Sequence, residues 1–174
     1  WIKNRDATDA HMIFDSSRGV TKRLSSDSNA VEVTDGDTLD AFQSDGFRVD
    51  ADVKVNTNAE EYVAWQWKAN GGTRTTVTES GANPGGGHQS DTTAGFSIVD
   101  YVGTGGAGHV THGLGAVPEW IVFKNRDETE SWLIYHVAIG NGKGLRLDTT
   151  AAVDTTANHF ANTTPNSTTI VVGG

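Results

Sequence analysis

The letters KNRD stand at residues 3–6 and again at residues 124–127. The two copies lie 121 residues apart (124 − 3), and the similarity continues beyond them at the same spacing. Residues 12–14 (MIF) meet residues 133–135 (LIY), apolar on apolar. A repeat of this length exceeds a solenoid unit and is close to the size of a small domain. We therefore expect two related copies of one folding unit.

The two copies match unequally at their ends. With a short deletion Phe42 can be placed on Phe160, but residues 95–119 have no counterpart at the N-terminus. This pattern predicts a segment of a longer tandem array. Its expected parts are the C-terminal part of one repeat unit (1–70), a Gly/Thr/Ser-rich linker (71–94) and the N-terminal part of the next unit (95–174).

The remaining pattern favours short strands joined by polar turns. Apolar residues alternate with polar ones or form runs of three or four, and none of these segments shows a helical period over eleven or more residues. We predict an all-β fold, an antiparallel β-sandwich or jelly-roll-like architecture built of two related partial repeats. The clearest strand candidates are residues 46–50, 52–56 and 62–67, with a hairpin of 120–124 and 132–136 around the loop 125–131.

Composition excludes several classes of partner and chemistry. The net charge is −9, so binding to nucleic acid or to an anionic membrane surface is not expected. The chain has no cysteine, which rules out disulfides and thiolate metal sites. No apolar run reaches membrane-spanning length. Only 36% of the residues are hydrophobic, so oligomerisation would help to bury apolar surface.

The repeated tetrapeptide has a structural interpretation and a functional one. Asn and Asp side chains bond to nearby backbone and tolerate bent conformations, so Asn-Arg-Asp suits a hairpin turn, and we favour this interpretation. A turn at the tip of a module can also contact a partner. The surface-binding candidates are Asn4, Arg5, Asp6, Asn125, Arg126, Asp127 and Trp132.

The tryptophans are expected to pack more often than to bind. Trp65 and Trp67 fall on one face of a predicted strand, and Trp120 begins an apolar run, so all three are predicted to be core residues. Trp132 follows a polar loop, which makes it the best candidate for an exposed ring that stacks on a sugar. Packing is still favoured over sugar binding.

Metal and cofactor sites are weakly indicated, and we predict none. His109 and His112 have an HxxH spacing, but without a helix or a nearby Glu it does not form a zincin site. We expect His112 to hydrogen-bond the backbone of a Gly-rich turn. Asp35, Asp37 and Asp40 resemble a calcium loop only loosely, because EF-hand spacing and its terminal Glu are absent.

No pattern typical of catalysis is present. The chain lacks a G-x-S-x-G nucleophile elbow and a phosphate-binding loop. The pairs Glu60/Glu61 and Glu128/Glu130 stand out only because carboxylates are common. We do not expect an enzyme.

Six phrases of the chain carry a resemblance to a known family. They are WIKNRD (1–6), FDSSRG (14–19), SDGF (44–47), YVAWQWKANG (62–71), GFSIV (95–99) and HGLGAVP (112–118). Together they resemble a repeated domain of virion proteins in tailed phages, particularly marine and cyanobacterial phages. The second copy departs from the first, because His136 replaces Asp15 and no Arg-Gly pair follows it.

The resemblance implies a virion structural protein. The favoured function is a tail-fibre or appendage domain that presents a host-attachment surface. The alternatives are a capsid decoration or head-fibre protein and a carbohydrate-binding module of a tail depolymerase. Expected partners are other virion proteins, further copies of the chain in a homo-oligomer (a trimer is one arrangement considered) and a host cell-surface glycan or receptor.

Overall fold

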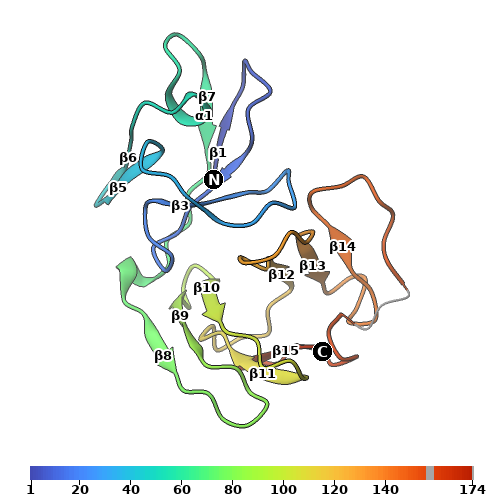
Figure 1. The fold of residues 1–174 in the computed structure, drawn as a ribbon. Coiled ribbons are helices and arrows are strands. Elements are labelled where there is room, and N and C mark those ends of the chain that lie inside the picture. Colours follow the sequence, from blue (N-terminus) through green and yellow to red (C-terminus); the bar gives the residue numbers. More distant parts are fainter. Residues whose placement is uncertain (156–158, 174) are drawn as a thin grey trace. The chain divides into compact units, whose positions relative to one another are not determined.

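The structure, a computed structural model, describes residues 1–155 and 159–173. These residues form two compact units whose regular secondary structure is almost entirely short strands (Figure 1), and the predicted all-β, antiparallel class is confirmed. Residues 123–132 and 147–150 of the second repeat copy belong to unit 1. Unit 1 comprises Trp1–Gln66, Phe123–Trp132 and Leu147–Thr150, and unit 2 comprises Trp67–Val122, Leu133–Arg146 and Ala151–Gly174.

Unit 1 is built on a five-stranded antiparallel sheet with the strand order β4-β3-β2-β1-β7. The first four strands follow one another along the chain, and β7 returns to pair with the outer edge of β1. The strands are β1 (Ile2–Asn4), β2 (Met12–Ile13), β3 (Lys22–Ser25), β4 (Val33–Thr34) and β7 (Tyr62–Ala64).

The core of unit 1 collects apolar side chains from the neighbouring strands β1 and β2 and from residue 55, later in the chain. Ile2, Met12 and Val55 are buried together, and Met12 is fully buried. A hairpin of β5 (Leu39–Gln43) and β6 (Gly46–Val49) adds to this core through side chains of β6. Burial of each large aliphatic side chain stabilises the fold by about 1.5–3 kcal/mol.

The prediction of a strand at residues 52–56 is wrong. The structure has a one-turn helix there, α1 (Val53–Asn56). The Asp52 carboxylate accepts a hydrogen bond from the Lys54 N–H at 2.7 Å, as an N-cap does, and this stabilises the turn of helix. In this conformation Val55 reaches the core, whereas Val53 is exposed, so only one of the two alternating valines is buried.

Unit 2 contains three small antiparallel sheets, with strand orders β10-β9-β8, β11-β15 and β12-β13-β14, and a 3₁₀ turn, η1 (Asn70–Gly72). The last residue of β12 is counted in unit 1. β12 and β13 are neighbours, as predicted for the hairpin around residues 125–131. The strands are β8 (Thr75–Val77), β9 (Gly86–Asp91), β10 (Phe96–Tyr101), β11 (Gly108–Thr111), β12 (Trp120–Phe123), β13 (Leu133–His136), β14 (Leu145–Arg146) and β15 (Thr169–Val172).

The Gly-rich segment 71–94 contains strands β8 and β9 and so is not the irregular linker that its composition predicts. β9 runs between β8 and β10, and its neighbours approach closely. A Cβ atom on Gly86 would lie 2.0 Å from the carbonyl oxygen of Asp100, and one on Gly87 would lie 2.5 Å from that of Thr75. These glycines therefore serve close strand packing rather than flexibility.

The strand register recurs at the spacing of the internal repeat. Met12 pairs with Ser25 and Ile13 with Leu24 in unit 1, and the residues 121 positions later pair in the same way. Leu133 lies opposite Arg146, and Ile134 opposite Leu145. A one-residue slip would turn every side chain to the other face, so an identical register is a strict criterion.

Hydrogen bonds around these strands repeat at the same spacing. The His11 N–H donates to Asp27 Oδ1 at 2.9 Å, and the Trp132 N–H donates to Asp148 Oδ1 at 3.0 Å. The turn after the second strand also recurs, although Asp15 is replaced by His136. Asp15 Oδ1 accepts from the N–H of Ser17, and His136 Nδ1 accepts from that of Ala138. His136 thus accepts the hydrogen bond that Asp15 accepts in the first copy, although the residue type differs.

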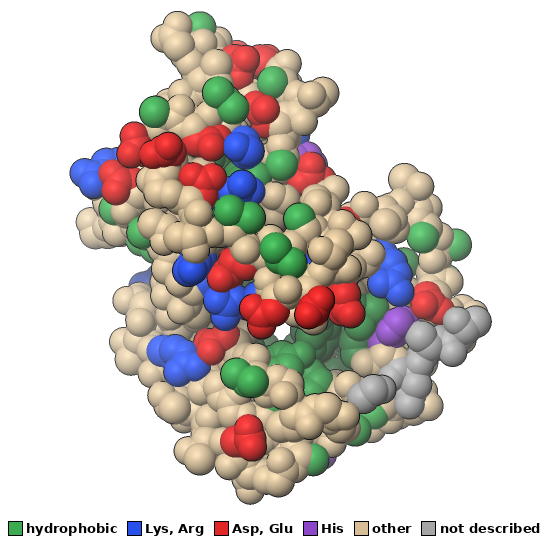
Figure 2. Space-filling model, in the orientation of Figure 1, with side chains coloured by type: hydrophobic (Ala, Val, Ile, Leu, Met, Phe, Trp, Pro, Cys, Tyr) green, Lys and Arg blue, Asp and Glu red, His purple; other side chains and the backbone are tan. Residues whose placement is uncertain are grey.

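The surface carries both signs of charge despite the net charge of −9. On the face drawn in Figure 2, basic side chains stand beside acidic ones and form no continuous basic field. None of the helices formed by the described residues has the length and apolar character needed to cross a bilayer.

Candidate functional site

The first KNRD turn is an Asx-type turn built by its own side chains. Asn4 Oδ1 accepts hydrogen bonds from the N–H groups of Asp6 at 2.9 Å and Ala7 at 3.2 Å. Lys3 Nζ donates to the carbonyl oxygens of Asn4 and Ala7, at 2.5 and 2.9 Å. The tetrapeptide therefore provides most of the bonds that close the turn.

The second KNRD turn has the same construction. Asn125 Oδ1 accepts from the N–H groups of Asp127 at 3.0 Å and Glu128 at 3.2 Å. Lys124 Nζ donates to the carbonyl oxygens of Asn125 at 2.7 Å and Glu128 at 3.3 Å. The structural interpretation of the repeated sequence is therefore confirmed, because each copy forms a turn of the same type with equivalent hydrogen bonds.

The surroundings of the first turn differ from those expected of an exposed tip. Asn4 is 1% exposed, so its assignment as a surface residue is wrong. Its Nδ2 group donates to Asp9 Oδ2 at 2.8 Å and to Glu60 Oε2 at 2.5 Å. Arg5 and Asp6 are exposed, but both contact the residue before β7. Arg5 forms an ion pair with Glu61, and Asp6 Oδ2 accepts the Glu61 N–H at 2.6 Å.

At the second turn Asn125, Arg126 and Asp127 are all exposed, as the sequence predicts. Arg126 nevertheless has a partner inside unit 1. Its Nε and Nη2 groups donate to the two carboxylate oxygens of Glu32, each at 2.8 Å. Such two-point pairing fixes the orientation of both groups.

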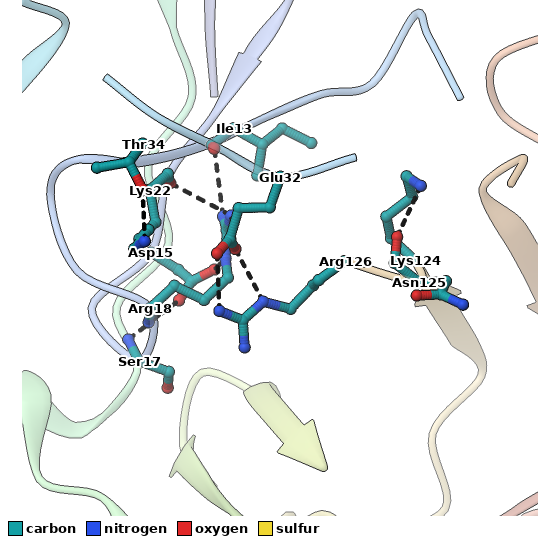
Figure 3. Close-up of polar contacts among 10 residues, drawn as sticks. All are labelled: Ile13, Asp15, Ser17, Arg18, Lys22, Glu32, Thr34, Lys124, Asn125 and Arg126. Carbon is teal, nitrogen blue, oxygen red and sulfur yellow. Dashed lines mark hydrogen bonds and ion pairs between the residues drawn. The ribbon is translucent and has the colours of Figure 1, made fainter. Parts of the chain in front are cut away.

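This pair is part of the Arg18–Glu32 cluster, which we define as Asp15, Arg18, Glu32 and Arg126 (Figure 3). The Arg18 side chain is only 6% exposed and lies between the two carboxylates. It donates to Asp15 Oδ2 at 2.5 Å and to Glu32 Oε2 at 3.2 Å. Glu32 thus accepts hydrogen bonds from one arginine of each repeat copy, Arg18 and Arg126.

Opposite charges stabilise the ionised forms in this cluster. Burial by itself would raise the pKa of Glu32, but hydrogen bonds from Arg126 and Arg18 outweigh it and the pKa lies below its ordinary value. The hydrogen bond to Glu32 raises the pKa of Arg126. The contact between Glu32 and Arg126 therefore stabilises the ionised form of both side chains.

Trp132 is 5% exposed, so the favoured packing interpretation is confirmed and its assignment as a surface-binding candidate is wrong. Its Nε1 group donates to the carbonyl oxygens of Ser25 at 2.9 Å and Ser28 at 3.0 Å. These two bonds satisfy the polar edge of the ring inside unit 1, which lets a large apolar side chain fill the core. The polar loop before Trp132 gave no sign of this, because the acceptors come from the first repeat copy.

The three tryptophans predicted to be core residues are exposed instead. The exposed fractions are 48% for Trp65, 53% for Trp67 and 54% for Trp120. β7 ends at Ala64, so the strand face that should have buried Trp65 and Trp67 does not extend to them. Trp67 stacks on Phe96 with a centroid distance of 6.0 Å and an interplanar angle of 19°.

The histidine prediction is confirmed for His112. Its Nδ1 atom accepts the Leu114 N–H at 3.2 Å, and its Nε2 atom lies 3.1 Å from the Asn166 carbonyl oxygen. His109 is exposed and lies 3.4 Å from the hydroxyl group of Thr169. Within residues 1–155 and 159–173, no three His, Asp or Glu side chains gather as a metal site would require.

The aspartates of the loosely calcium-like loop contact arginines. Asp35 Oδ2 accepts from Arg23 Nε at 2.8 Å, and Asp35 Oδ1 accepts the Asp37 N–H at 3.2 Å. Asp40 forms an ion pair with Arg48 at 2.6 Å across the β5–β6 hairpin. These are the bonds of a turn and of cross-strand pairing.

His88 is a buried polar residue that the sequence analysis missed, because it lies in the segment assigned to a linker. It is 8% exposed and approaches Ser90 Oγ at 3.3 Å. Gly113, with φ +70°, leaves the space that the ring occupies, since a Cβ there would lie 2.2 Å from His88 Cε1. Burial, and then the nearby His112 and Arg74, lower the pKa of His88.

The Arg18–Glu32 cluster predicts unequal costs for removing its members. Replacing Glu32 by Ala leaves the buried Arg18 with one carboxylate fewer and should lower the free energy of unfolding by about 1–3 kcal/mol. Arg126→Ala should cost less than about 1 kcal/mol, because that side chain is 43% exposed. Denaturant unfolding measures both changes, with Asp40→Ala at an exposed pair as the control. Equal costs for Glu32→Ala and Asp40→Ala would contradict this assignment.

The lowered pKa of His88 predicts that unit 2 becomes less stable in weak acid. The ordinary pKa is 6.5, so below that pH the unfolded chain binds a proton that the folded chain does not. Stability should therefore fall as the pH decreases from about 7.5 to about 5.5. Urea unfolding midpoints at the two pH values test this, and the decrease should be smaller in His88→Gln. An equal decrease in the variant would exclude His88 as the cause.

Comparison with known proteins gives one family. The sequence model of a family described as a domain of unknown function, DUF7483, matches residues 1–174. No curated protein and no solved structure matches the chain. Because the match covers every residue, the chain belongs to the DUF7483 family.

Proposed function

We propose that this chain is a non-enzymatic structural module of a phage virion, part of a tail fibre or related appendage in which the repeat unit recurs. The main support is that the two KNRD turns are closed by equivalent side-chain hydrogen bonds. The strand pairs that follow the two turns also share one register. A unit that keeps its register and its turn is suited to linear arrays that present one surface many times.

The polar side chains at the turns also support a scaffold role. Asn4, Lys3 and Lys124 bond to the backbone of their own turns, and Glu32 is held by two arginines. A catalytic carboxylate or nucleophile is normally exposed to substrate and has a perturbed pKa that suits its task. In the Arg18–Glu32 cluster the lowered pKa of Glu32 and the raised pKa of Arg126 favour the charged forms of these two side chains instead.

Attachment to a host surface would use weak sites repeated along the array. Multivalent display raises the overall affinity by orders of magnitude without a strong single site. The charges interspersed in Figure 2 favour a polar partner such as a glycan over nucleic acid. Further copies of this chain in a homo-oligomer would add to the same effect.

A carbohydrate-binding role is the second candidate, and one observation favours it. The Trp67 ring is half exposed and held flat against Phe96, so its orientation is fixed before any ligand binds. Preorganised aromatic rings stack on the apolar faces of sugars at low entropic cost. Trp67 therefore replaces Trp132 as the residue to test.

The proposal is tested on particles. Antibodies against the purified chain, coupled to gold, should label the tail appendages of virions that encode it. Labelling of the head would favour the decoration alternative, and the absence of label from intact and disrupted particles would overturn the virion assignment. If host polysaccharide binds, Trp67→Ala should abolish binding, whereas Trp120→Ala is the matched exposed control.

A further inference from the structure

The two repeat copies differ in what lies along the first strand of each turn. In the first copy β1 is flanked by β2 on one side and by β7 on the other. In the second copy β12, the counterpart of β1, is the end strand of its sheet, with β13 as its neighbour. Edge strands of this kind are templates for the addition of another strand.

In the first copy the KNRD residues hold β7 in place. The Arg5 N–H donates to the Glu61 carbonyl oxygen at 2.8 Å, and the Glu61 N–H donates to Asp6 Oδ2 at 2.6 Å. Asn4 Nδ2 donates to the Glu60 carboxylate. Asn4, Arg5 and Asp6 therefore each contribute at least one bond to the pair of glutamates that precedes β7.

In the second copy the same three groups have no such contacts. Among residues 1–155 and 159–173, the side-chain nitrogen of Asn125 and the backbone N–H of Arg126 donate no hydrogen bond, and the Asp127 carboxylate accepts none. All three residues are exposed, whereas Asn4 is 1% exposed. The structure thus contains one turn with its strand bound and one equivalent turn with these three bonding groups exposed.

We propose that residues 124–127, at the end of β12, form an acceptor site for an extended strand of the β7 type, supplied by a further copy of the repeat unit. The incoming segment carries two acidic residues followed by aromatic and β-branched residues, as residues 60–64 (EEYVA) do. The β1–β7 pairing sets the register. Lys124 lies opposite the residue equivalent to Val63, and Asn125 lies opposite the equivalent of Tyr62.

The recognition chemistry follows from the occupied turn. The Asp127 carboxylate accepts the backbone N–H of the second acidic residue, and the Arg126 N–H donates to its carbonyl oxygen. Asn125 binds the carboxylate of the first acidic residue. Glu32 takes only the guanidinium and the carbonyl oxygen of Arg126, so it uses none of these three groups. This inference depends on the repeat geometry and not on the virion assignment.

A synthetic peptide tests the site on the whole chain. We would titrate the acetylated and amidated peptide AEEYVAWQ (residues 59–66) into ¹⁵N-labelled protein and follow the backbone amides by NMR. Residues 124–127 should shift and saturate, and a peptide with Pro in place of Val63, which cannot complete the ladder, should bind more weakly. Because one charge-assisted hydrogen bond is lost, Asp127→Ala should weaken binding about tenfold.

The controls separate this site from other outcomes. Asp45→Ala removes an exposed carboxylate from the β5–β6 turn and should leave binding unchanged. No shift at millimolar peptide, equal binding by Asp127→Ala, or shifts confined to residues 4–6 through exchange with β7 would each overturn the proposal. Self-association of the chain that the peptide does not compete with would also overturn it.

Discussion

One asparagine side chain at each turn organises the strands around it. Its oxygen accepts two consecutive backbone N–H groups, which fixes the direction in which the chain leaves the first strand and enters the second. The pairing register, the aspartate that caps the second strand and the following bend then recur at the same spacing. A local bond is thus what makes the two copies equivalent.

The two copies use this equivalent turn in different surroundings. The first turn is covered by the chain that leads into β7, and the second contacts Glu32 of the first copy through Arg126. The buried Trp132, which also belongs to the second copy, donates hydrogen bonds to the carbonyl oxygens of Ser25 and Ser28 in the first copy. Identical letters therefore lead to one buried and one exposed asparagine, which no local property of KNRD distinguishes.

What the sequence could predict follows from the range of the forces involved. The all-β class and the turn depend on neighbours within a few residues, and the sequence pattern predicted both. Burial depends on residues distant in the chain, so the pattern predicts burial for Trp65, Trp67 and Trp120, which are exposed, and makes the buried Trp132 a surface candidate. The glycines of residues 71–94 predict a flexible linker, although Gly86 and Gly87 lie in a strand whose neighbours approach closely. A capping aspartate decided the conformation of residues 52–56 against the alternating pattern.

The most direct test of this account compares the free energies of unfolding of Asn4→Ala and Asn125→Ala. Both variants lose the two turn bonds, but Asn4→Ala also leaves the Asp9 and Glu60 carboxylates without their shared donor. We predict a loss of about 0.5–1.5 kcal/mol for Asn125→Ala and of at least about 2 kcal/mol for Asn4→Ala. If both variants were as stable as the parent chain, the turn would not organise the fold and the account would be wrong.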